Sequence, residues 1–223
     1  MSDQEALINL DDIGGEIQKY DDDTFKEVVT SGGYLARLQL MTSQSNKCKS
    51  GAFPINHYAL VRDGNHIDAG KEVDVLIIAW RPKAIQITDE TVIAVFDHTT
   101  DQFKNIVEQS EVKDSGCLYG PEFLVWVPSQ KTFALFFMGS KSSRRESPNV
   151  KALLLKSGTL EPKFVDTKKY QWYTPAIKPC STPFENPDTE DLKEQVAKFN
   201  NPPVSEVEVA EESGDNSAED RAR

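Results

Sequence analysis

The sequence has few cysteines and no long hydrophobic run. Its three cysteines, Cys48, Cys117 and Cys180, lie far apart, and an odd number of widely spaced cysteines fits reduced thiols better than a disulfide framework. A zinc site drawing on Cys48, His57, His66 and Cys117 is the alternative, but these residues lack the close spacing of structural zinc ligands. We therefore predict no metal and no other cofactor.

The apolar stretches are too short to cross a membrane. The longest lie at residues 75–80 and 133–138, whereas a membrane-spanning helix needs about 20 apolar residues. Residues 1–12 have neither the basic start nor the apolar centre of a secretory signal. These absences predict a cytoplasmic protein (in the host cytoplasm if it is viral) that makes no contact with membrane.

Recognisable catalytic motifs are also lacking. Gly70-Lys71 is followed by Glu72 and lacks an earlier glycine at the required spacing, which excludes a P-loop. The patterns G-x-S-x-G, H-E-x-x-H and G-x-G-x-x-G do not occur. We predict that the protein is not an enzyme. A nucleic-acid-processing enzyme remains the alternative, and a metal at His57, His66 or Asp97 would be evidence for it.

What the sequence does contain is an uneven distribution of charge. The formal net charge is −11. Residues 1–28 hold nine acidic residues against two lysines, a net of −7, and residues 185–223 hold twelve against four basic residues, a net of −8. The intervening part carries 15 acidic and 19 basic residues, a net of +4. A basic core between acidic ends fits a surface that attracts phosphates and is shielded by tethered acidic segments, although acidic ends can also serve solubility alone.

The hydrophobic patterns predict many short strands and few helices. Helical spacing or capping residues indicate helices at residues 21–30, 100–111 and 191–199. Residues 73–80 form a mostly apolar run that we expect to end at Arg81-Pro82. The clearest hairpin joins two aromatic-rich runs, 123–127 and 132–138. The other strands are expected at residues 34–41, 91–97, 151–156, 163–167 and 170–173.

These elements predict a mainly β fold, an OB-like barrel or a β-sandwich, with a few short helices and a disordered acidic C-terminal tail. We divide the chain into an acidic N-terminal segment with a short helix (residues 1–30), a β-rich nucleic-acid-binding core (residues 31–184) and an acidic tail (residues 185–223). The tail is expected to hold a short helix followed by disorder.

One basic cluster follows the most apolar strand. Residues 139–147 contain four serines together with Lys141, Arg144 and Arg145, and we expect them to form a loop at one end of the sheet. Hydroxyl groups and cations together can bind phosphate oxygens. The alternative is an ordinary solvated basic loop.

A second cluster combines cations with aromatic rings. Residues 168–173 contain Lys168, Lys169, Tyr170, Trp172 and Tyr173. Exposed rings beside cations suit a single strand, because bases stack on the rings while phosphates approach the charges. The alternative places Trp172 in the core.

A strand end repeats this combination of a ring with cations. Residues 80–83 contain Trp80, Arg81 and Lys83, and we expect Arg81 and Lys83 to reach the surface. Trp80 is either exposed for stacking or part of the core.

This layout is similar to phage-type single-stranded DNA-binding proteins. The resemblance covers the β-rich core, the clusters around Lys141 and Trp172, and the acidic tail. It implies an OB-fold core and a tail that recruits replication partners. The tail departs from the pattern because it ends in Arg221-Ala222-Arg223 instead of an aromatic residue, which puts docking through the extreme terminus in doubt.

The resulting hypothesis is a sequence-non-specific single-stranded DNA-binding protein of replication or recombination. Its tail would compete for the binding surface or contact replication and recombination proteins, and a homodimer is left open. The alternative is a phage structural or replication-accessory protein that binds protein only. The nucleic-acid-binding residues would be Lys141, Arg144, Arg145, Lys168, Lys169, Tyr170, Trp172, Trp80, Arg81 and Lys83.

Overall fold

A computed structural model describes residues 35–62, 65–87, 91–112, 115–167, 170–180, 185–201 and 206–208. The helix expected at residues 21–30, the disorder expected at the end of the tail, and Lys168 and Lys169 lie outside these residues. The strands are β1 (Ala36–Leu40), β2 (Tyr58–Arg62), β3 (Asn65–Gly70), β4 (Val73–Ile87), β5 (Thr91–Val95), β6 (Cys117–Val127), β7 (Thr132–Phe137), β8 (Ser157–Asp166), β9 (Gln171–Pro179) and β10 (Glu206–Glu208). The helices are α3 (Asn46–Lys49), α4 (Asp101–Gln109), α5 (Lys141–Lys151) and α6 (Thr189–Asn200), with a 3₁₀ turn, η2, at Pro128–Gln130.

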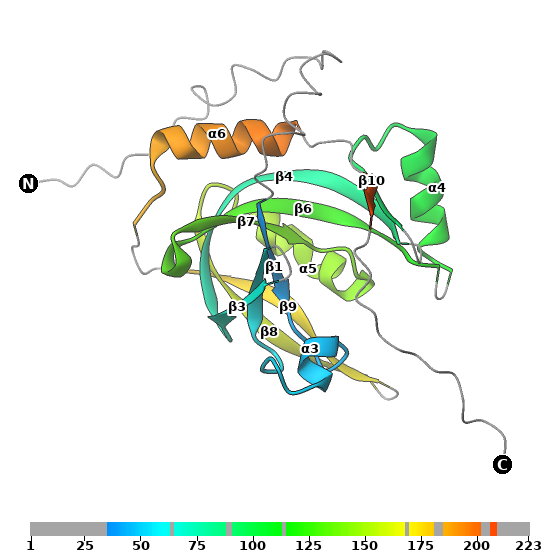
Figure 1. Cartoon of the computed structure of the whole chain (residues 1–223), viewed down its shortest axis with the longest axis horizontal. Coiled ribbons are helices and arrows are strands. Elements are labelled where there is room, and N and C mark those ends of the chain that lie inside the picture. The colour runs from blue at the N-terminus through cyan, green and yellow to red at the C-terminus, as the bar shows by residue number, and fades with distance from the viewer. Residues whose placement is uncertain are drawn as a thin grey trace, which may run out of the picture.

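The strands form one curled sheet. Its order is β10-β5-β4-β6-β7-β1-β2-β3, and β8 pairs with β4 and carries β9 on its other side. Figure 1 shows β4, β6 and β7 as an arch with α6 above it and α5 below it. The expectation of a mainly β fold with few helices is therefore confirmed.

The two sides of the arch have separate cores. Alternate residues of β6 point to opposite faces, so Phe123 and Val125 join the core that includes Val150 of α5. Leu124 and Trp126 pack on the other side against Leu192, Val196 and Phe199 of α6. Helix α6, which the predicted boundary at residue 185 assigned to the tail, thus packs against the sheet.

Strand β4 is longer than the sequence suggests. The expectation that it ends at Arg81-Pro82 is wrong, because the strand continues to Ile87. Pro82 faces Pro121 of β6, and it lies between the stretches of β4 that pair with β8 and with β5. A residue without an N–H group fits at this position because the outer edge of β4 changes partner there.

Two further expectations about secondary structure are wrong. Residues 139–147, expected to form a loop, lead into and form most of α5, and residues 151–156, expected to form a strand, contain the end of α5 and the turns after it. The inward face of α5 carries Ser143 and Ser147 together with Val150, so it lacks the apolar periodicity that identifies a buried helix. The expected hairpin and the helices expected at residues 100–111 and 191–199 are confirmed as β6–β7, α4 and α6.

Candidate nucleic-acid interface

Helix α5 presents a basic stripe to solvent. The side chain of Ser140 caps the helix by accepting a hydrogen bond from the backbone N–H of Ser143 at 3.1 Å. Lys141 and Arg145 are exposed and lie one helical turn apart, with Asn149 a further turn along. Two of the predicted phosphate-binding cations therefore share the outer face of one helix.

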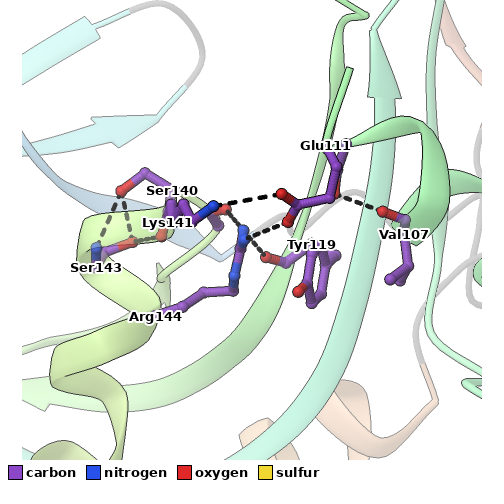
Figure 2. A network of polar contacts seen from close by, with 9 residues as sticks. Val107, Glu111, Tyr119, Ser140, Lys141, Ser143 and Arg144 are labelled. Carbon is purple, nitrogen blue, oxygen red and sulfur yellow. Dashed lines mark hydrogen bonds and ion pairs between the residues drawn. The ribbon is translucent and has the colours of Figure 1, made fainter. Parts of the chain in front are cut away.

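The third cation of this cluster, Arg144, is held by the fold. Its Nη1 donates to the carbonyl oxygens of Gly139 (2.6 Å) and Tyr119 (3.1 Å), and its guanidinium lies 3.9 Å from the centre of the Tyr119 ring. The Nη2 atom lies 3.7 Å from a carboxylate oxygen of Glu111. Figure 2 shows Arg144 between Tyr119 and the start of α5, with the Glu111 carboxylate beside it. Arg144 is thus oriented before any ligand arrives.

Glu111 bridges the two cations at the start of α5. Its Oε2 lies 3.4 Å from Nζ of Lys141, and its Oε1 faces Arg144. The side chains of Lys141 and Glu111 are 70% and 57% exposed, so the contact between them is open to water. A solvent-exposed ion pair of this kind contributes about 0–1 kcal/mol and is readily exchanged.

The β8–β9 hairpin carries the aromatic residues. Its register pairs Phe164 with Tyr173 and Val165 with Trp172, so the two pairs lie on opposite faces. The rings of Phe164 and Tyr173 are in contact, with centroids 5.1 Å apart. Phe164 is 50% exposed, and Trp172 and Tyr173 are partly exposed. The hairpin therefore offers aromatic surface to solvent.

Tyr170 lies at the tip of this hairpin and is 62% exposed. Its backbone N–H donates to Oγ1 of Thr167, and the backbone N–H and the hydroxyl of Thr167 both donate to the Tyr170 carbonyl. These bonds close the turn from both sides. Lys168 and Lys169, which connect the two residues, belong to the part of the chain that the structure does not describe.

Packing brings the two predicted clusters together. Helix α5 packs against β9. An ion pair joins α5 to β8, with Nζ of Lys163 2.6 Å from Oε1 of Glu146. The helix that carries the basic stripe therefore contacts the hairpin, with an ion pair at Lys163, one residue before Phe164. This contact could not be predicted from the sequence, because about 20 residues separate residues 139–147 from residues 168–173.

Trp80 joins the same helix from β4. It is 43% exposed, and Nζ of Lys151, the last residue of α5, lies 3.3 Å from its ring centre. Partial burial lowers the pKa of Lys151. The ring of Trp80 is thus partly covered by a cation, a contact of the kind that stabilises aromatic–ammonium pairs.

Arg81 and Lys83 form ion pairs inside the fold. Both contact the carboxylate of Glu122, which is buried, and their own side chains are only 14% and 17% exposed. Arg81 also donates to the carbonyl oxygen of Phe199 at the end of α6. The expectation that these two cations reach the surface is wrong, because a buried carboxylate draws them inward.

Four residues of the surface were not identified from the sequence: Glu111, Lys151, Lys163 and Phe164. Phe164 could have been found by aligning residues 163–167 with 170–173 as a hairpin, because this register places it opposite Tyr173. Glu111 and Lys151 give no such signal, since their contacts depend on how α4 and α5 pack.

The residues weighed as metal ligands are dispersed among different surroundings. Cys48 packs in a small core with Phe53, and Cys117 packs in another against α4. His57 is bonded to Asp68 at 3.0 Å. Within the described residues, no group of three or more His, Cys, Asp or Glu side chains could hold a metal ion. None of the helices in the same part of the chain is long and apolar enough to cross a membrane.

Comparisons of the chain with protein-family models, curated proteins and solved structures found no match.

Proposed function

We propose that the protein binds single-stranded nucleic acid without sequence specificity, through the surface formed by α5, the β8–β9 hairpin and Trp80. The observation that supports the proposal is that α5, which carries the exposed Lys141 and Arg145, packs against the β8–β9 hairpin, which carries exposed aromatic rings. A single strand needs this combination, because each base offers a face for stacking and each phosphate a negative charge.

The residues divide into two roles. Tyr170 at the tip of the hairpin stacks bases together with Phe164 and Trp172 on its two faces, and Trp80 is a further ring next to α5. Lys141, Arg145 and Lys163 neutralise phosphates, and Arg144 contributes its Nη2 edge. Lys168 and Lys169 are also proposed to neutralise phosphates, because they directly precede the three aromatic residues at 170–173 in the sequence. Arg81 and Lys83 are omitted because both contact the buried carboxylate of Glu122.

The wider proposal follows from the architecture and from the distribution of charge. The curled sheet is proposed to act as an OB-like platform, and the protein to act in DNA replication or recombination, as the resemblance to phage-type proteins implies. The acidic C-terminal residues compete with the strand for the basic surface or recruit replication and recombination proteins. The activity is binding without catalysis.

The test is a fluorescence-anisotropy titration of a labelled oligo-dT strand and of a matching duplex, each at low and at moderate salt. The expected result is tight binding to the single strand that weakens steeply with salt, with weaker binding to the duplex. Equal binding to both would contradict the preference for single strands. The absence of binding to either would contradict the proposal as a whole.

A second candidate is a protein that binds only protein, and the position of β9 favours it. In the described sheet β9 pairs with β8 alone, so its outer edge and the neighbouring aromatic rings could receive a second copy or another chain. This candidate predicts self-association or a protein complex with no salt-dependent binding of oligonucleotides. Sedimentation of the protein with and without oligo-dT separates the two candidates.

A further inference from the structure

The anion that bridges Lys141 and Arg144 belongs to the protein itself. Glu111 follows α4, and its two carboxylate oxygens face the two cations at the start of α5, 3.4 and 3.7 Å away (Figure 2). The carboxylate thus lies where these cations would hold one phosphate of a bound strand.

We propose that Glu111 takes the place of a strand phosphate in the free protein and must be displaced when nucleic acid binds. This inference rests on the proposed function, since it assigns regulation to the same surface. Glu111 then limits affinity and excludes weak anionic ligands, while a polyanion with several simultaneous contacts can displace it.

The distances from Glu111 to the two cations indicate weak ion pairs that a phosphate can replace. Both distances are longer than the about 2.7–2.9 Å of a strong charge-assisted hydrogen bond. By contrast, Glu146 of α5 lies 2.6 Å from Lys163 of β8, and Glu146 is only 15% exposed. Glu111 is 57% exposed, so water and salt already compete for it.

Arg144 is positioned to bind a phosphate in place of the Glu111 carboxylate. Its Nη1 is occupied by two backbone carbonyl oxygens, and its guanidinium stacks on Tyr119. These contacts involve neither Glu111 nor its carboxylate, so they can persist when the carboxylate leaves. The Nη2 edge then faces an incoming phosphate without a change in the position of the arginine.

The experiment compares Glu111→Gln with Glu108→Gln, a matched loss of one negative charge. Glu108 is exposed on α4, and the structure describes no side-chain contact between it and a cation. We expect Glu111→Gln to tighten oligo-dT binding about three- to tenfold at low salt, and Glu108→Gln to change it less than about twofold.

Both substitutions are repeated with Lys141→Gln, where the gain from Glu111→Gln should shrink because one of the two cations is missing. Thermal unfolding of each variant checks that the fold is retained. Equal gains from Glu111→Gln and Glu108→Gln would show a general charge effect and overturn the inference. A gain that persists unchanged with Lys141→Gln would overturn it too. If neither the parent protein nor any variant binds oligo-dT, the proposed function fails together with it, whereas binding without a Glu111 effect removes the inference alone.

Discussion

Arg81 on β4 and Glu122 on β6 lie directly opposite each other, and Arg81 donates from both Nε and Nη2 to the same carboxylate oxygen, at 2.9 and 2.6 Å. Lys83 contacts the second oxygen of Glu122 at 2.5 Å. Because Arg81 also bonds the carbonyl oxygen of Phe199, this charged group joins the sheet to the end of α6. The buried carboxylate of Glu122 therefore positions Arg81 and Lys83, and Arg81 in turn contacts the end of α6.

Glu122→Gln is expected to lower the free energy of unfolding by about 2–4 kcal/mol, because it leaves two largely buried cations without a compensating charge. Urea denaturation measures the change. Glu185→Gln is the control, since the Lys131–Glu185 pair is more than 70% exposed on both sides and should contribute less than about 0.5 kcal/mol. Similar losses from both substitutions would show that Glu122 is not specially stabilising.

The stability should fall at alkaline pH through Tyr58. Burial, with a smaller effect of Glu161, raises the pKa of this phenol far above its ordinary value near 10. The folded protein therefore keeps a proton that the unfolded chain loses. The stability from the protonated phenol of Tyr58 is fully present below about pH 10. Above that pH the free energy of unfolding falls by up to about 1.4 kcal/mol per pH unit.

Tyr58→Phe should cost about 1 kcal/mol at pH 8, because it removes the hydrogen bond to the Glu161 carbonyl, and should reduce the alkaline loss of stability. Urea unfolding between pH 8 and pH 11.5 measures both effects. The prediction is wrong if Tyr58→Phe and the parent protein share one slope.

Removal of an exposed ring from the hairpin should weaken binding of single strands. Tyr170→Ala and Phe164→Ala are each expected to weaken oligo-dT binding about 5- to 100-fold, because stacking of one base contributes about 1–3 kcal/mol. Anisotropy titrations at fixed salt measure this effect. Ile87→Ala also truncates a half-exposed apolar side chain, but at the end of β4 that pairs with β5, whereas β8 pairs with the opposite end of β4, and it should not alter binding. An equal effect at Ile87 would remove the hairpin from the interface.

Arg145 should contribute through charge alone. Arg145→Gln is expected to reduce the slope of log affinity against log salt by about 1, with the same effect on every oligonucleotide sequence. Lys193→Gln is its matched control, because Lys193 lies on α6, across the sheet from α5. A reduced slope for Lys193→Gln, or none for Arg145→Gln, would place the phosphate contacts elsewhere.

Truncation after Glu208 should tighten binding of single strands. It removes residues 209–223, with five acidic residues and two arginines, and it retains β10, which pairs with β5. The gain should be several-fold at low salt and should disappear at high salt, since the competition is electrostatic. A full-length chain with these five acidic residues changed to Gln or Asn should bind like the truncated one. Unchanged or weaker binding after truncation would refute competition by the tail.

Features that depend on neighbouring residues could be predicted from the sequence. The aromatic-rich runs 123–127 and 132–138 and the turn between them predicted the β6–β7 hairpin, and the spacing of Phe103 and Ile106 predicted α4. The basic core and the acidic ends can likewise be read by counting. Local periodicity and composition carry this information because an apolar run between turn residues, or apolar residues at helical spacing, must be buried against neighbouring elements.

Which cations reach the surface depends on the packing of segments that are distant in the sequence. Arg81 and Lys83 look like surface cations in the sequence, yet Glu122, about 40 residues away, draws them into the interior. Lys141 and Arg145 face solvent because serines occupy the inward positions of α5. Helix α5, which carries them, packs against β9 of the hairpin that holds the aromatic residues. The partner of a charged side chain is chosen by packing between distant segments, and a pattern of residues along the chain does not contain that choice.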